Sequence, residues 1–236
     1  MLNLFEKNGL VFWNEKQIRL RRMMESYFVD VVRDCLRSQN KAFDLYQVEA
    51  PILTPKSVIS PQYTENDVFH LKTDLCLRPE TTAGSYLYAY HLLMPNSGVR
   101  MPLCVWQHGK SFRNEQDQAT KHMRLKEFYQ LEFQILYSES TKCDYSVELF
   151  PAICKAMSNM IGPCRLEDSD RIPSYSERTV DVVHEARNME VCSMSKRKDW
   201  AQGKCVEVAI GTDRCVFCFE NREPDNVASA DNPPSV

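Results

Sequence analysis

The chain has 236 residues, of which 43% are hydrophobic and 26% are charged, and its formal net charge is −3. This length and composition predict one ordinary globular domain, and the slight acidic surplus excludes the general basic attraction by which many proteins bind nucleic acid. No apolar run reaches the roughly 18 residues that span a bilayer, and the first residues show no secretory pattern, so we expect a cytoplasmic protein that does not contact membranes.

The first half of the chain alternates helices with short extended segments. Residues 13–40 predict a long amphipathic helix, because apolar side chains recur there at helical spacing. Residues 44–54 predict a strand, in which Pro51 favours a sheet edge or a strand end because proline cannot donate a ladder hydrogen bond. A short strand over 75–77 and a helix over 82–93 are expected next.

The second half contains most of the predicted strands. The clearest pair covers 103–115 and 124–137, joined by a polar stretch. A helix over 147–160 follows, and a short helix begins at Thr212 after the break at Gly211. Between these two helices we expect short strands near residues 179–183, 189–195 and 204–210.

These elements predict an α+β fold with a mainly antiparallel sheet, because strands and helices occur without a repeated βαβ unit. We expect one domain over 1–220 and a disordered tail over 221–236, which is rich in polar residues and proline without periodicity. The ten cysteines are scattered, as in a protein with reduced thiols. Cys215 and Cys218 have zinc-ligand spacing without a second pair, which leaves two interpretations: a zinc site, or packing on one helical face.

The predicted strand pair has a polar and an apolar face, because successive side chains of a strand point to opposite sides. On the first strand, one face holds Gln107, Gly109, Ser111, Arg113 and Glu115. On the second strand, the polar face holds Arg124, Lys126, Phe128, Gln130 and Glu132. The other side of the second strand is mostly apolar, and we expect the core to lie against its residues Leu125, Tyr129, Leu131, Phe133 and Ile135.

The polar face has two interpretations, an exposed charged surface or a nucleotide site. Arginine forks bind phosphate oxygens, and an aromatic ring stacks on a base, a contact worth roughly 1–3 kcal/mol. A solvated face does not need Phe128 between its charges. We therefore favour the nucleotide site.

The strand pair resembles a known motif. "FRNE" at 112–115, followed by Arg124, Phe128 and Glu132, is similar to motif 2 of class II aminoacyl-tRNA synthetases. That motif reads F-R-x-E, a variable loop, then H/R-x-x-x-F-x-x-x-D/E, and every defined position is filled at the required spacing.

Two further segments extend the resemblance. "EVAIGTDR" at 207–214 looks like motif 3, and the segment with Pro51 after the long helix is similar to motif 1. Within the class, "LRPETTAG" at 77–84 and "GKSFRNE" at 109–115 resemble the glycyl enzymes. The resemblance covers roughly 4–220 and implies the class II synthetase-type fold, a mainly antiparallel β-sheet flanked by helices.

The resemblance also implies an ATP site. Arg113 would hold the α-phosphate and stabilise charge during attack by the amino acid carboxylate, and Arg124 would bind the γ-phosphate. Phe128 would stack on adenine, Arg214 would cover the other side, and Glu115 would contact the adenine amino group. Arg113 and Arg214 are the candidate catalytic residues, because placement does most of the work in such a reaction. The ATP-binding candidates are Arg113, Glu115, Arg124, Phe128, Glu207 and Arg214.

Recognition of the amino acid would fall beside the ATP site. The candidates are Arg78, Glu80, Thr81, Gln130, Glu132, Asp181 and Glu190, with Thr179 on the same strand face as Asp181. Glu80 could pair with the substrate ammonium, or it could be an acid favoured by a helix N-terminus. Magnesium would neutralise the phosphates, with Glu190 and Glu207 as candidate ligands, since carboxylates suit this ion. The alternative for both glutamates is a salt bridge on a strand.

By resemblance, we expect ATP-dependent activation of an amino acid, glycine first, as its adenylate, and transfer to tRNA. The chain departs from the glycyl pattern at Ala83, Lys196 and Ala209, which belong to the amino acid pocket more than to the ATP site. Two alternatives stay open. One is a ligase with a non-tRNA acceptor such as a carrier protein, and the other is a non-catalytic accessory subunit of synthetase origin.

The resemblance further implies partners. We expect a homodimer formed through the long helix and the strand with Pro51. We also expect a core without the anticodon-binding domain that follows motif 3 in the glycyl enzymes. Choice of tRNA would then rest on the acceptor stem and on the loop 116–123, which carries one lysine and one histidine.

Overall fold

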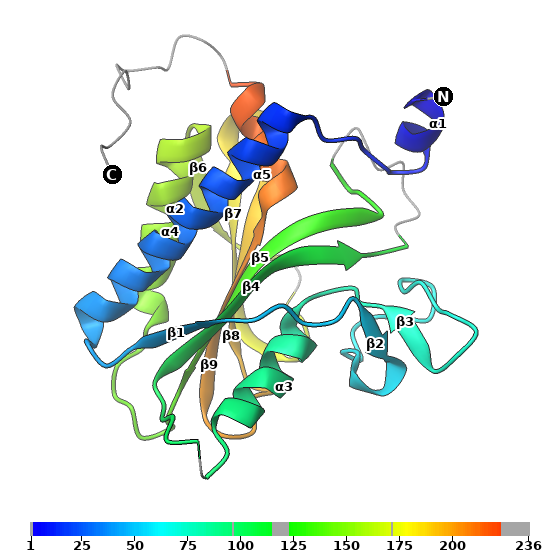
Figure 1. Cartoon of the computed structure of the whole chain (residues 1–236). Helices are drawn as coiled ribbons and strands as arrows, with labels where there is room; N and C mark the ends of the chain where they lie inside the picture. Colours follow the sequence, from blue (N-terminus) through cyan, green and yellow to red (C-terminus); the bar gives the residue numbers. More distant parts are fainter. Residues whose placement is uncertain (1, 96, 115–122, 171, 223–236) are drawn as a thin grey trace.

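The computed structural model describes all residues except 1, 96, 115–122, 171 and 223–236. A seven-stranded sheet forms its centre (Figure 1). The strand order is β1 (Asp44–Gln47), β4 (Leu103–Phe112), β5 (Glu127–Tyr137), β9 (Lys204–Gly211), β8 (Met189–Arg197), β7 (Ser176–His184) and β6 (Cys164–Asp168). β1 pairs with β4 in parallel, and the other neighbouring strands of this sheet are antiparallel. The α+β fold with a mainly antiparallel sheet is confirmed.

Smaller elements complete the fold. β2 (Leu53–Pro55) and β3 (Leu75–Leu77) form a separate antiparallel pair. The helices are α1 (Leu2–Lys7), α2 (Glu15–Gln39), α3 (Thr82–Leu92), α4 (Ser146–Ile161) and α5 (Thr212–Glu220), with the 3-10 turns η1 (Lys56–Val58) and η3 (Glu185–Arg187). No helix in the described ranges is long and apolar enough to cross a membrane.

The long helix α2 forms where the apolar spacing predicts it. Its N-terminus is closed by a capping box, in which the Asn14 side chain accepts from the Gln17 amide and the Gln17 side chain accepts from the Asn14 amide. Apolar side chains at intervals of four residues are buried along one stripe, namely Leu20, Met24, Phe28, Val32 and Leu36. This stripe faces the sheet.

The main core lies between the sheet and the helices α2, α4 and α5, which gather on one side of the sheet in Figure 1. Leu131, Phe133 and Ile135 are fully buried there, as the alternation along the second strand predicts. Cys215 and Cys218 of α5 are fully buried in the same core. Packing is therefore the interpretation that holds for the two thiols, and the described residues form no metal-binding group of His, Cys, Asp and Glu.

The other face of the sheet is covered only in part. α3 lies against β4 and β5 over a small apolar cluster that includes Ala89, Leu103 and Trp200. The β2–β3 pair lies beyond α3 in Figure 1. On this face, beside the N-terminus of α3, the sheet carries buried polar side chains, which we call the polar floor; they include Gln107, Gln130, Glu132 and Gln134.

Some predicted bounds were wrong. The single strand over 44–54 is two strands in different sheets, because Pro51 lacks an amide hydrogen and lies between them. The strand pair is shorter than predicted and ends at Phe112 and Glu127, and strand β6 was not predicted. The predicted tail falls almost entirely on 223–236, outside the described residues.

Candidate active site

The polar floor follows from strand register, because residues directly opposite one another share a face. One row across the sheet is Ser111 and Phe128, and the next is Gly109, Gln130 and Gly211. A third row is Gln107, Glu132, Ala209, Ser193 and Asp181. A fourth is Gln134, Glu207, Ser195 and Thr179. The predicted polar faces of the two strands therefore meet, as the alternation requires.

Three buried carboxyl groups form an acidic cluster at this floor: Glu132 and Glu207 on the sheet, and Glu80 in the segment before α3. The hydroxyls of Thr81 and Thr82 donate to Glu132 Oε2, the latter over 3.2 Å. Thr82 Oγ1 also lies 3.0 Å from Glu207 Oε2, so one hydroxyl joins two acids. Burial, then the charges of Glu207 and Glu80, raise the pKa of Glu132 to about 8. The cluster therefore presents carboxyl oxygens that can accept hydrogen bonds from a ligand.

Arg197, for which the sequence analysis predicted no role, is the cation that pairs with the acidic cluster. Its Nη1 lies 2.8 Å from Glu207 Oε2, and its Nη2 lies 2.6 Å from Asp199 Oδ2. Its guanidinium carbon stands 3.7 Å from the ring centre of Tyr175 and 5.4 Å from that of Tyr86. Arg197 follows Ser193 and Ser195 at alternate positions on the same strand face, and this alternation was the signal that could have identified it.

Arg113 stands between the floor and a loop. Its guanidinium carbon lies 5.2 Å from the centre of the Phe128 ring. Nε donates to the carbonyl of Pro79 over 3.1 Å, and Nη2 donates to the Tyr63 hydroxyl over 3.0 Å. Tyr63 in turn donates to Glu80 Oε2 over 2.9 Å. Arg113, the predicted phosphate-binding residue, therefore lies beside Phe128 and is linked to Glu80 of the acidic cluster through Tyr63.

The third predicted arginine approaches from α5. Arg214 Nη1 donates to the Glu190 carbonyl over 2.8 Å and lies 3.6 Å from the Glu190 carboxylate. The charges of Arg214, Arg113 and Arg124 all act on that carboxylate. Burial raises the pKa of the Glu190 carboxyl most, and the charges of the three motif arginines lower it, so all three lie within electrostatic reach of Glu190.

Arg78, a predicted contact of the amino acid, is held by backbone carbonyls in this structure. Its Nε donates to the Lys110 carbonyl over 2.8 Å, and its Nη1 donates to the Ala50 carbonyl over 2.6 Å. A Cβ atom at Gly109 would lie 2.3 Å from Arg78 Nη2, so the glycine permits this close crossing. Arg78 is buried and holds the segment before Glu80 onto the sheet.

Polar atoms without partners lie on the floor. Among the described residues, Ser111 Oγ, Gln130 Oε1 and Asp181 Oδ1 are buried side-chain atoms that make no hydrogen bond. Gln130 stands between two glycines in its row, Gly109 and Gly211. Buried polar atoms of folded proteins are nearly always paired, so a water or a ligand is expected to supply a partner to each of these atoms.

The predicted magnesium ligands do not lie together. Glu207 of β9 lies opposite Ser195 of β8. Glu190 is also on β8, five residues before Ser195, and five residues span about 16 Å along a strand. One ion cannot bind both carboxylates, and Glu207 is already engaged by Arg197, Thr82 and Gln134. The residues therefore do not fit the predicted metal site. Glu115 and most of the loop 116–123 lie outside the described residues.

Comparison with known sequences gives partial matches. No family model matches the chain. A glycine–tRNA ligase of Mycoplasmopsis synoviae is 31% identical over 118 residues, which cover 48% of this chain and 26% of that protein. A histidine–tRNA ligase of Campylobacter hominis is 31% identical over 129 residues, covering 53% and 30%. A glycine–tRNA ligase of Agathobacter rectalis is 27% identical over 160 residues, covering 64% and 34%. The chain thus spans about a third of these relatives or less.

Comparison with solved structures shows the fold. A pyrrolysyl-tRNA synthetase from Desulfitobacterium hafniense aligns with a TM-score of 0.58 at 17% identity and covers 92% of this chain and 88% of that one. A second structure, described as PylSc from the same organism, aligns with the same TM-score of 0.58 at 20% identity. It covers 81% of this chain and 67% of that one.

Proposed function

We propose that this chain, a class II aminoacyl-tRNA synthetase-type catalytic core, uses ATP to activate an amino acid as its adenylate. One observation carries the proposal. Arg113 and Phe128 adjoin each other on one side of Tyr63, and the buried carboxylate of Glu80 lies on the other side. A site for a base and phosphates therefore borders a site for an ammonium group.

The residues account for the chemistry without a side-chain nucleophile. A carboxylate oxygen of the amino acid attacks the α-phosphorus of ATP and forms an O–P bond. The bond from this phosphorus to the oxygen that bridges to the β-phosphate breaks, and pyrophosphate leaves. Arg113 stabilises the charge that develops on the phosphate, and fixed cations of this kind contribute most when water is excluded. Phe128 provides a stacking surface for adenine, with Arg214 approaching from α5. Orientation of the two substrates supplies the remainder of the rate.

Glycine is the amino acid substrate that the acidic cluster and its surroundings favour. The buried carboxyl oxygens of Glu80, Glu132 and Glu207 can accept hydrogen bonds from an α-ammonium group. Arg197, packed between Tyr86 and Tyr175, occupies the space on the floor beside Glu207. A small substrate avoids displacing this buried ion pair, which would be costly. Two of the relatives described above carry the name glycine–tRNA ligase.

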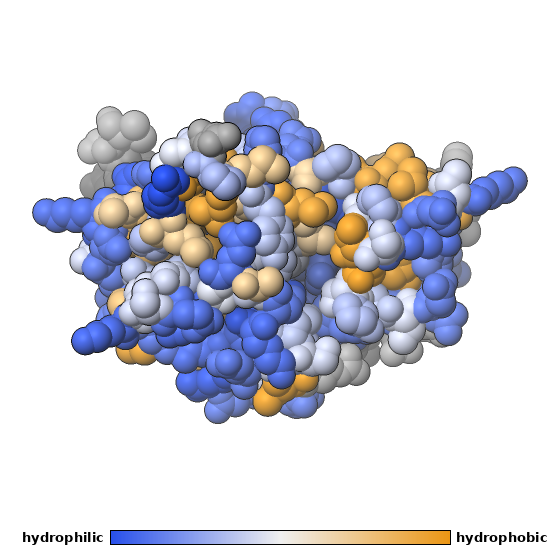
Figure 2. Space-filling model, turned by 90° about the horizontal axis from the view of Figure 1, so that it is seen from below, coloured by the Kyte–Doolittle hydropathy of each residue, from blue (hydrophilic) through white to orange (hydrophobic). Residues whose placement is uncertain are grey.

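The proposal extends to partners. The acceptor is the 3′ end of a tRNA, bound at the acceptor stem, and the protein acts in the cytoplasm as a homodimer. Ile52 and Leu53, beside Pro51, are 41% and 48% exposed, as expected for apolar side chains that a second subunit would cover. Seen from below, the surface is mostly hydrophilic with several separate hydrophobic patches (Figure 2).

Pyrophosphate exchange tests the activity. The purified chain is incubated with ATP, labelled pyrophosphate and each of the twenty amino acids in turn. We expect exchange with glycine, loss of exchange in Arg113→Ala with an unchanged circular dichroism spectrum, and normal exchange in the control Arg165→Ala, which alters an exposed ion pair. Near-normal exchange in Arg113→Ala would contradict the proposed role of this arginine.

Transfer assays separate the alternatives. Exchange followed by charging of tRNA supports the proposed function. Exchange without charging of any tRNA favours a ligase with a non-tRNA acceptor. Failure to bind ATP in a calorimetric titration favours a non-catalytic accessory subunit.

A further inference from the structure

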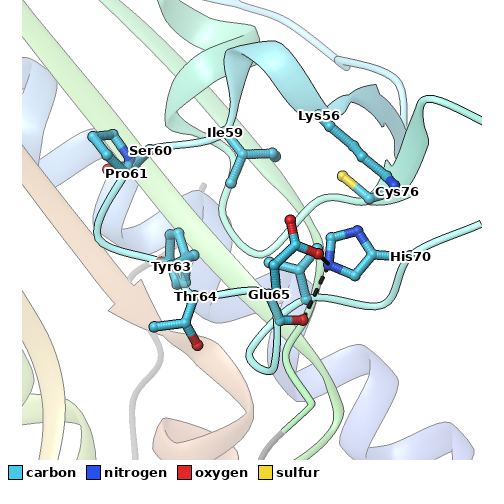
Figure 3. A pocket seen from close by; sticks show the side chains of 10 residues that line it. Lys56, Ile59, Ser60, Pro61, Tyr63, Thr64, Glu65, His70 and Cys76 are labelled. Carbon is cyan, nitrogen blue, oxygen red and sulfur yellow. Dashed lines mark hydrogen bonds and ion pairs between the residues drawn. The ribbon is translucent and has the colours of Figure 1, made fainter.

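The loop between η1 and β3 reaches into the site through one side chain. Figure 3 shows Tyr63 on this loop, at the wall of a cavity of about 110 Å³. The Tyr63 hydroxyl lies between two groups of the candidate active site, the Arg113 guanidinium and the Glu80 carboxylate. It is 3.0 Å from Arg113 Nη2 and 2.9 Å from Glu80 Oε2.

The direction of the two hydrogen bonds follows from chemistry. A guanidinium only donates, so the hydroxyl oxygen accepts from Arg113, and its single proton points to Glu80. Burial raises the pKa of Tyr63 well above its ordinary value, so the hydroxyl keeps this proton. Tyr63 therefore joins a cation to a carboxylate in a fixed order.

Neighbouring contacts tie the same groups together. Gln62 Nε2 donates to Glu80 Oε2 over 3.2 Å, next to the Tyr63 bond. Arg113 Nε donates to the carbonyl of Pro79, the residue before Glu80. The orientation of Arg113 is consequently linked to the position of Glu80 through both the loop and the backbone.

We propose that Tyr63 is a positioning residue that couples the two substrate sites, so that an amino acid bound at Glu80 strengthens the binding of ATP phosphates at Arg113, and the reverse. This inference rests on the proposed function. A ligand that fixes the Glu80 carboxylate also fixes the Tyr63 hydroxyl and, through it, the guanidinium. The second ligand then finds Arg113 already ordered, and coupling of this kind is reciprocal.

Calorimetric titration measures the coupling directly. The probe is α,β-methylene ATP, which cannot release pyrophosphate, titrated with and without saturating glycine. In the wild-type protein we expect glycine to tighten its binding about tenfold, the size of one hydrogen bond to a charged group. In Tyr63→Phe, which keeps the ring, we expect the ratio of the two dissociation constants to approach one. A change that only weakened the fold would alter both constants together and leave their ratio unchanged.

Tyr27→Phe is the matched control, because Tyr27 lies on α2, against the core on the far side of the sheet. It should keep the wild-type ratio. An unchanged ratio in Tyr63→Phe, or independent binding of the two ligands to the wild-type protein, overturns the inference and leaves the proposed function intact. Failure of the wild-type protein to bind either ligand overturns the proposed function, and the inference falls with it.

Discussion

Stability of the protein should fall as pH rises through the range in which Glu132 loses its proton. The pKa of Glu132 is raised from 4.5 to about 8, first by burial and then by Glu207 and Glu80. The folded state therefore binds more protons than the unfolded state between these two values, and the unfolding free energy decreases as pH increases. Below about pH 4.5 the Glu132 carboxyl is protonated in both states, so it does not change the dependence of the unfolding free energy on pH.

The magnitude follows from the same two values. A tenfold change in proton affinity is worth about 1.4 kcal/mol, so the full loss above pH 8 is about 5 kcal/mol for a rigid site. Relaxation around the ionised carboxylate lowers this figure, and we expect a measured loss on the order of 3 kcal/mol. That is a large part of the stability of an ordinary domain.

Glu132→Gln isolates the contribution of this residue. The amide keeps an acceptor for the Thr81 and Thr82 hydroxyls but carries no titrating proton. Urea unfolding between about pH 5 and pH 9 should show a shallower decline in the variant, with a remaining slope from Glu80, whose pKa is also raised by burial. Glu139→Gln, at an exposed position, should follow the wild-type curve. Parallel curves for Glu132→Gln and the wild-type protein would refute the reasoning.

Three other outcomes can be measured. Phe128→Ala should weaken ATP binding by roughly 1–3 kcal/mol in a calorimetric titration, and an unchanged dissociation constant would mean that adenine stacks elsewhere. Arg21→Ala should lower the free energy of unfolding in urea by about 3–5 kcal/mol, because it removes the ion-pair partner of buried Asp213, whose Oδ1 lies 2.8 Å from Arg21 Nη1. A loss below about 1 kcal/mol would contradict this expectation. Sedimentation should give a dimer, and Leu53→Asp should shift it toward monomer.

Local sequence was sufficient for the long helix and for the two faces of the strand pair. The stripe of α2 and the alternation that separates Phe128 from Leu131 depend on neighbours within a few positions, so their periodicity can be read directly. Spacing within motif 2 identified Arg113 and Phe128 as neighbours, and the structure brings them within contact.

The sequence by itself thus determined the helices α2, α3, α4 and α5, most strands and the core side of the strand pair. Only the tertiary structure decided that Tyr63 joins Arg113 to Glu80, that Arg197 pairs with Glu207, and that Arg78 serves the backbone. These contacts join residues far apart in the chain, and no local pattern encodes which loop returns to which strand. Long-range packing sets that choice, because burying a charge is tolerated only where a distant partner neutralises it.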